Sequence, residues 1–295
     1  MKKSKIFLII TLIITAVGIG ILMFFIISTA GKKRIEPAVI TTTSMAPVDD
    51  SEKLIKTPNQ SDLFKPKAGK TPSDYKPNEV VAASLYTLIN TSNFMSTTTG
   101  ESKSLFVTQK IEGTRVKMEK LAYNMSASSG LVNTAFDAFF NDTNCQYRKT
   151  DKIDNLAKTE VEVIGYDKYL EKYGHLPMDA TGYLINEETY KVSPTIKKIG
   201  DDYVISIELD PASDKGPYWY KREIATNAGT EIEPVFHYMK LKLTIDNSFR
   251  ILKLEVDEEY EVNKIITATA NTKYTEVFSY ENVDFPADVK EKYIN

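Results

Sequence analysis

Few residues of this chain could carry out covalent or acid–base chemistry, and they form no catalytic pattern. The 295 residues include one cysteine, Cys145, and two histidines, His175 and His237. One cysteine excludes an intrachain disulfide and a cysteine-rich zinc site. A thiol becomes a nucleophile only beside a base or a cation. Arg148 and Lys149 are close in sequence, but a single thiol in a strand is expected to be inert. We expect His237 to be structural and His175 to be a loop residue.

Three groups of acidic residues supply oxygen atoms of the kind that calcium binds: Asp201 with Asp202, Asp210 with Asp214, and residues 257–259. None follows the spacing D-x-[DN]-x-[DN]-G of a calcium-binding loop. Solvated turns and strand edges are therefore the expected positions of these carboxylates. Known catalytic motifs such as G-x-S-x-G, H-E-x-x-H and G-x-G-x-x-G are absent from the sequence. These patterns predict a protein that is not an enzyme and has no metal and no cofactor.

Charge is distributed unevenly along the chain. Residues 1–78 contain 12 Lys/Arg and 6 Asp/Glu, a net charge of +6, whereas residues 79–295 contain 25 and 34, a net charge of −9. A folded region of net charge −9 has no basic footprint for nucleic acid. Such a region is also repelled by an anionic bilayer unless something holds it there. Nucleic acid is therefore excluded as a partner.

An uncharged apolar run, Ile6–Ile27, is the strongest single signal in the sequence. Its 22 residues exceed the roughly 20 that span a bilayer. A cleavable signal peptide ending at Ala30 is the alternative, but its apolar region is normally only ~7–15 residues long. Because the part before the run is very short and the part after it is large, we expect the N-terminus inside the cell and the C-terminus outside. The sequence thus predicts a single-pass cell-membrane protein, anchored in the lipid bilayer through this run, with an extracytoplasmic C-terminal domain.

The chain divides into three parts on composition. Residues 1–28 form the predicted anchor, residues 29–77 a disordered tether, and residues 78–295 a β-rich domain. Six of the 12 prolines fall between residues 31 and 78, where aromatic residues are nearly absent. Such a segment cannot bury enough apolar surface to offset its chain entropy. It would set how far the domain stands from the membrane.

The first half of the domain is predicted to be a helix followed by strands. Asn78 is a candidate N-cap for a helix that ends near Asn90. Alternating apolar residues predict strands from 94 to 124, with a hairpin turn at Glu112-Gly113 and a bulge after Met118. A further hairpin is expected at 136–149, turning at 141–142. Two short helices are expected at 166–173 and 179–190.

The second half shows clearer alternation. A strand is expected from Tyr203 to Leu209, after a turn at 200–202. Asp210 and Pro211 predict the start of a helix that ends at Gly229. The segment 238–262 predicts an antiparallel hairpin that turns at 246–247, and a final strand or pair of strands is expected at 265–280. The overall fold class is α+β and β-rich.

The order of these elements resembles the LolA/LolB/LppX-like lipoprotein-carrier superfamily. The residues that carry the resemblance are Asp210-Pro211 leading to the aromatic run 218–222, followed by the hairpin strands 236–245 and 250–260. It is closest to the uncharacterised membrane-anchored members of Gram-positive bacteria and covers residues 79–285. It implies a curved antiparallel sheet, a half barrel covered by a few helices, after the N-terminal transmembrane helix. It also implies a cavity for acyl chains or other apolar groups.

These inferences lead to a first hypothesis, that the domain binds an apolar or lipid-like ligand between sheet and helices. The candidate ligand contacts are apolar residues of the late helix and of the strands it would face: Ile205, Ile207, Tyr218, Trp219, Ile224, Leu241, Leu243 and Leu254. The same residues would form an ordinary helix–sheet core if no ligand binds. A second hypothesis is a docking module without a cavity, which binds an envelope protein or a cell-wall polymer. An enzyme would need a cluster of carboxylates or His237 in a cleft, and the sequence assembles no such cluster.

Overall fold

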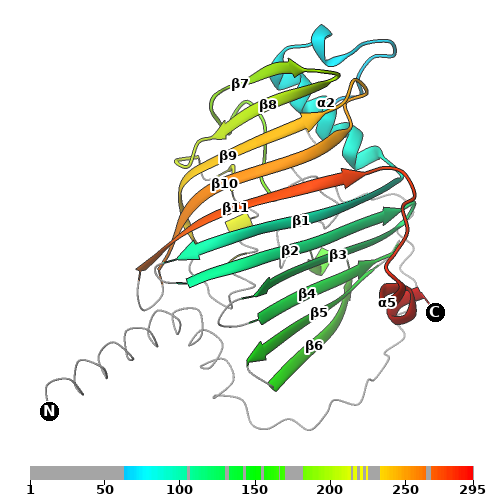
Figure 1. The fold of residues 1–295 in the computed structure, drawn as a ribbon, viewed down its shortest axis with the longest axis vertical. Coiled ribbons are helices and arrows are strands. Elements are labelled where there is room, and N and C mark those ends of the chain that lie inside the picture. The colour runs from blue at the N-terminus through cyan, green and yellow to red at the C-terminus, as the bar shows by residue number, and fades with distance from the viewer. Residues whose placement is uncertain are drawn as a thin grey trace, which may run out of the picture.

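The computed structural model of the 295-residue chain describes residues 63–104, 107–129, 133–141, 144–153, 156–165, 167–169, 182–213, 215–217, 220, 221, 224, 233–263 and 267–294 (Figure 1). The helical elements are the 3-10 turn η2 (Pro72–Asp74), α2 (Pro77–Asn90), α5 (Ala287–Val289) and η3 (Lys290–Ile294). The strands are β1 (Asn93–Ser104), β2 (Val107–Met118), β3 (Leu121–Ser129), β4 (Asn133–Phe140), β5 (Asn144–Ile153), β6 (Leu156–Gly165), β7 (Tyr190–Ile199), β8 (Asp202–Leu209), β9 (Val235–Ile245), β10 (Ile251–Asn263) and β11 (Thr267–Ser279).

All eleven strands belong to one antiparallel sheet in the order β6-β5-β4-β3-β2-β1-β11-β10-β9-β8-β7. Two meanders, β1–β6 and β7–β11, meet where β1 pairs with β11. The outermost strands β6 and β7 do not pair with each other, so the sheet is open, and it twists visibly from one edge to the other in Figure 1. The predicted β-rich antiparallel fold with few helices is confirmed.

Helix α2 covers one face of the sheet, which we call the inner face. Its Val81, Leu85 and Leu88 are buried in one cluster with strands β8, β9 and β10. The helix begins at Pro77 rather than after Asn78, because proline presets the helical backbone angle at the first position. The Glu79 carboxylate accepts the backbone N–H of Lys76 at 2.8 Å, which satisfies one of the free donors at this helix end.

Two smaller hydrophobic clusters complete the packing. On the inner face of β3–β6, Phe136, Phe140, Cys145 and Ile164 pack with Tyr169, from the helical residues 167–169. On the opposite, outer face, the C-terminal segment with α5 and η3 covers strands β2–β4 through Val289 and neighbouring aromatic residues (Figure 1). The inner face therefore carries separate apolar clusters toward its two edges.

Several strands lie where alternation predicts them. β8 alternates buried Tyr203, Ile205, Ile207 and Leu209 with more exposed residues. The β9–β10 hairpin turns at 246–250, and β4 pairs with the next strand, β5, in antiparallel register, both as predicted. Gly200 has φ +64 in the turn before β8, a conformation that favours glycine.

Other local predictions are wrong. Glu112 and Gly113 lie within β2, not in a turn. The parity change after Met118 is the β2–β3 hairpin, with Glu119 at φ 53, and not a bulge. Residues 182–189 form bends and turns instead of a helix. Residues 265–280 supply one strand, β11, rather than a pair. The strands β6 and β7 and the C-terminal helical turns were not predicted.

The predicted helix start at Asp210-Pro211 is also wrong. The Asp210 carboxylate accepts the Ala212 N–H at 3.0 Å and its carbonyl accepts the Ser213 N–H, so Asp210 closes a local turn. Among the described residues, a helical hydrogen bond is found further along, where the Pro217 carbonyl accepts the Lys221 N–H at 2.7 Å.

Residues 63–77, assigned to the tether from composition, pack against the sheet. The Tyr75 ring lies edge-on to Phe249 at 5.6 Å, and the Ser73 hydroxyl hydrogen-bonds Tyr203 at 2.8 Å. Apolar Leu63 and Phe64 contact the same cluster, and this burial offsets the chain entropy of the segment. The predicted span Ile6–Ile27 lies outside the described residues. Within the part that the structure describes, no helix is long and apolar enough to cross a membrane.

Candidate functional site

The structure brings together five of the eight predicted ligand contacts. Ile205, Ile207, Leu241, Leu243 and Leu254 are all buried on the inner face in the cluster with α2. A sixth, Ile224, is partly buried and packs against the same cluster. Tyr218 and Trp219 lie outside the described residues.

This cluster is a close-packed helix–sheet contact over β8–β10, where α2 supplies much of the cover. The late segment adds Tyr220, whose ring contacts those of Tyr183 and Phe236 with centroids 5.2 and 5.8 Å apart. A ligand that contacts these apolar residues would have to reach them beside α2 or from the centre of the sheet.

A buried carboxyl group lies on the inner face of β10. Glu258 has no exposed surface, and it accepts hydrogen bonds from the hydroxyls of Tyr183 and Tyr220, the latter at 2.9 Å. These tyrosines come from the segment after residue 181 and from the late helical residues. Glu258 therefore connects two separate segments to the sheet.

Burial dominates the electrostatics of this group. Desolvation raises the pKa of Glu258 to about 7, the two tyrosine hydroxyls oppose the shift, and the negative charge of Asp257 adds to it. Desolvation and the neighbouring Glu258 likewise raise the pKa of Tyr183 and of Tyr220 well above the ordinary value. Both phenols therefore remain protonated donors. Sequence analysis placed Glu258 among solvated acidic residues, and this was wrong.

A second charged group lies on the inner face where β2, β1 and β11 adjoin. The Arg115 guanidinium donates to Glu276 at 3.3 Å and lies 5.5 Å from the centre of the Phe94 ring. Glu276 is also the acceptor of the Ser96 hydroxyl. The side chains of Arg115 and Glu276 are 14% and 6% exposed, so both charges are held at a largely dehydrated surface.

Lys117 lies two residues further along β2 on the same face. Its ammonium donates to the Ile89 carbonyl at 2.7 Å, near the C-terminal end of α2, a favourable place for a cation. Desolvation and the charge of Arg115 lower the pKa of Lys117. In the described part of the chain, no carboxylate forms an ion pair with Lys117.

Cross-strand register shows what separates the apolar clusters. Residues that pair across adjacent strands form a row on the sheet. In the row of Lys117, its partner on β1 is Phe94 of the α2 cluster, and its partner on β3 is Ala122 of the second cluster. The next three rows of β1–β3 contain Arg115, Asn124 and Ile111, but their other positions are short. We call these short positions the central belt, which comprises Ser96, Thr98, Gly100, Gly113, Ser126 and Ser128. The belt lies on β1–β3, in the middle of the sheet (Figure 1).

Glycine is required at one position of this belt. A Cβ atom at Gly100 would lie 2.3 Å from the Lys273 carbonyl oxygen and 2.5 Å from the Tyr274 Cβ, so no larger residue fits without moving β11. Ser126, also in the belt, is exposed even though it lies in an interior strand. The belt thus forms a low, partly exposed strip between two apolar regions.

Among the described residues, the remaining candidates for chemistry, Cys145 and His237, lie on different strands, β5 and β9. Cys145 is buried in the second inner-face cluster, whereas His237 is 43% exposed and lies 3.7 Å from Glu261. His175 lies outside the described residues. In the described ranges no three His, Cys, Asp or Glu side chains are grouped as metal ligands would be.

No protein-family model and no curated protein matches this sequence. Several solved structures are similar to it, and two of them are described below. One is a domain described as an outer membrane lipoprotein-sorting protein from Vibrio parahaemolyticus, with a TM-score of 0.29 and 11% identity over 75% of this chain and 98% of that one. The other is a DUF1329 family protein from Desulfovibrio piger, with a TM-score of 0.29 and 8% identity over 74% of this chain and 96% of that one. A lipoprotein-sorting domain is thus among the similar structures, as the sequence resemblance predicts. The ligand must be inferred from this chain's own residues.

Proposed function

We propose that this chain is a membrane-anchored extracytoplasmic protein that holds an apolar or lipid-like ligand on the inner face of its sheet. The observation that best supports this proposal is that two apolar clusters lie on either side of the partly exposed central belt, on one face of an open sheet. A fully packed sheet face would continue its large apolar side chains across the central strands. Here serine, threonine and glycine occupy most of these positions on β1–β3.

The apolar run Ile6–Ile27 supports the membrane location in this proposal. Residues 63–77 pack on the sheet, so the folded domain begins at about residue 63. Compared with exposure to water, an acyl chain bound on the inner face would be stabilised by about 25 cal/mol per Å² of apolar surface removed from water. The ligand would contact the belt and the apolar residues at its two sides.

The test uses the full-length chain in membranes from an expressing host. A photoreactive long-chain alcohol with a diazirine on its alkyl chain is added, irradiated, and its adducts are assigned to residues by mass spectrometry. Adducts should concentrate on the inner-facing residues of β1–β3, such as Thr98 and Ser126. An even distribution over inner and outer faces would refute the proposal.

Matched variants sharpen this test. Ser126→Trp fills the belt and should reduce labelling several-fold, because the indole occupies the space of the alkyl chain. Ser129→Trp is the control, since Ser129 is an exposed serine of the same strand that points to the outer face. Equal labelling of both variants would contradict a site on the belt.

A further inference from the structure

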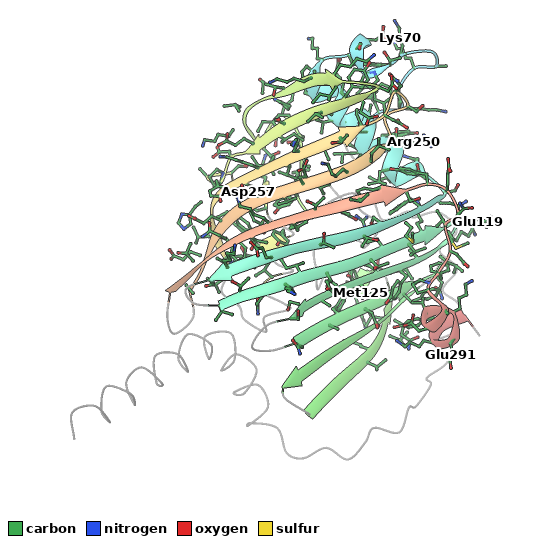
Figure 2. The ribbon with its side chains drawn as sticks, in the orientation of Figure 1. Lys70, Glu119, Met125, Arg250, Asp257 and Glu291 are labelled. Carbon is green, nitrogen blue, oxygen red and sulfur yellow. The ribbon has the colours of Figure 1, made fainter. Side chains whose placement is uncertain are left out.

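Two basic side chains, Lys117 and Arg115, lie at the end of the central belt that is nearest to α2. Register places Lys117 opposite Phe94 and Ala122, and Arg115 opposite Ser96 and Asn124, all on the inner face. Glu119, labelled in Figure 2, marks the hairpin two residues beyond Lys117. Both cations therefore lie near the rim of the sheet, where the belt begins.

The charges at this rim do not balance. Arg115 has a carboxylate partner in Glu276, whereas Lys117 has none in the described residues. An ammonium has three N–H donors. One is used by the Ile89 carbonyl, and the structure shows no acceptor for the other two among the described residues. A partly buried ammonium beside a second cation, between two apolar clusters, is an unfavourable arrangement unless an anion compensates it.

We propose that Lys117, assisted by Arg115, binds the anionic head group of the ligand, so that the ligand class is an acyl lipid with a carboxylate or phosphate head. This inference rests on the proposed function and specifies its substrate class. The head would lie at Lys117 and the acyl chain would follow β2 along the belt toward Ile111. Six residues of extended strand separate these two positions, about 20 Å, which matches a long acyl chain.

Structural roles for these two cations do not account for the whole arrangement. Capping of α2 needs one hydrogen bond, which a neutral or exposed donor could also supply. Capping does not explain why the lysine lies beside an arginine that lowers its pKa. An anionic head group would be attracted by both cations and would remove their mutual repulsion.

The experiment compares photoreactive palmitic acid with the matching photoreactive hexadecanol, which differ only in the head group. Both are added at pH 8 to membranes that contain the full-length chain, and adducts on β1–β3 are quantified. A charge-assisted hydrogen bond corresponds to a preference of about tenfold or more. We expect at least this excess of acid over alcohol adducts in the wild-type chain.

Three variants assign the preference to Lys117. Lys117→Met should make acid and alcohol labelling equal, and Lys117→Arg, which keeps the charge, should retain the preference. Lys110→Met is the matched control, because Lys110 is an exposed lysine of the same strand on the outer face. It should behave as the wild type. Competition with unlabelled oleate and with oleoyl lysophosphatidate then distinguishes a carboxylate from a phosphate head.

The outcomes separate the two proposals. Equal labelling of the wild type by acid and alcohol, or an acid preference that survives in Lys117→Met, would overturn the head-group inference and leave apolar binding intact. If neither probe labels the inner face above the outer face, the proposed function itself fails. The wild-type comparison needs no variant, so a folding defect in Lys117→Met cannot hide the result.

Discussion

Substitution of Glu258 by glutamine should remove most of a pH-dependent component of stability. The carboxyl is fully buried, and its pKa is raised from the ordinary 4.5 to about 7, mainly by burial. Folding therefore favours the protonated form. The contribution is complete below pH 4.5 and is lost as the pH rises through about 7.

The size of this effect follows from the two pKa values. The step from 4.5 to about 7 corresponds to about 3 kcal/mol of unfolding free energy. For a chain of this size each kcal/mol shifts the melting temperature by about 2–4 °C, which gives about 6–12 °C. The glutamine side chain is neutral throughout. Its carbonyl accepts from one tyrosine hydroxyl and its amide donates to the other, so Tyr183 and Tyr220 keep their partners.

The assay is thermal unfolding of the full-length chain in non-ionic detergent at pH 5, 6, 7 and 8. Part of this loss has already occurred at pH 5, so between pH 5 and pH 8 the wild type should lose about 5–10 °C relative to Glu258→Gln. Glu259→Gln serves as the control, because Glu259 is the neighbouring glutamate on the outer face. Its melting temperature should follow the wild type. Parallel pH profiles of wild type and Glu258→Gln would refute the argument that a buried carboxyl titrates in this range.

Three further changes test the packing. Leu243→Ala, at a fully buried position of β9, should destabilise the chain by about 2–5 kcal/mol through the cavity it leaves, measured by thermal unfolding. Gly100→Ala should lower the melting temperature despite adding one methyl group, because its Cβ would clash with the backbone of β11; an unchanged value would contradict the close approach of these strands. Tyr293→Phe removes the hydrogen bond to Asp137 and should speed digestion of the C-terminal segment by carboxypeptidase, while wild-type kinetics would show that this contact does not hold the segment.

Regular alternation made part of the fold predictable from sequence. β8, β9 and the first half of β10 combine one apolar face with one charged face, and this pattern sets their register. β7 was missed because it is an edge strand, with Pro194 and shifts of register that interrupt the pattern. Gly113 was interpreted as a turn residue, but it lies in β2, where an added Cβ atom would lie only 3.1 Å from the Thr98 Cβ. Sequence alone does not distinguish these two uses of glycine.

The candidate site was less predictable because it depends on which face a charged residue occupies. Glu258 belongs to a run of acidic residues that suggests a solvated edge. Continuing the alternation of Leu254 and Val256 by two residues places it on the apolar face, so the signal was present. No local pattern indicated Arg115 or Lys117, since their position opposite Phe94 and Ala122 follows only from pairing with β1 and β3.

Charged residues on the two faces of the sheet have different surroundings. On the outer face, Glu255 forms partly exposed ion pairs of 3.1 Å with Lys242 and Lys253, and such pairs contribute little to stability. On the inner face, Glu258 is fully buried and Lys117 is partly buried, so the loss of hydration disfavours a charge at either position. Positions that break the local pattern without a gain in stability are expected at functional sites. The inner face is therefore the part of this molecule where binding should be sought.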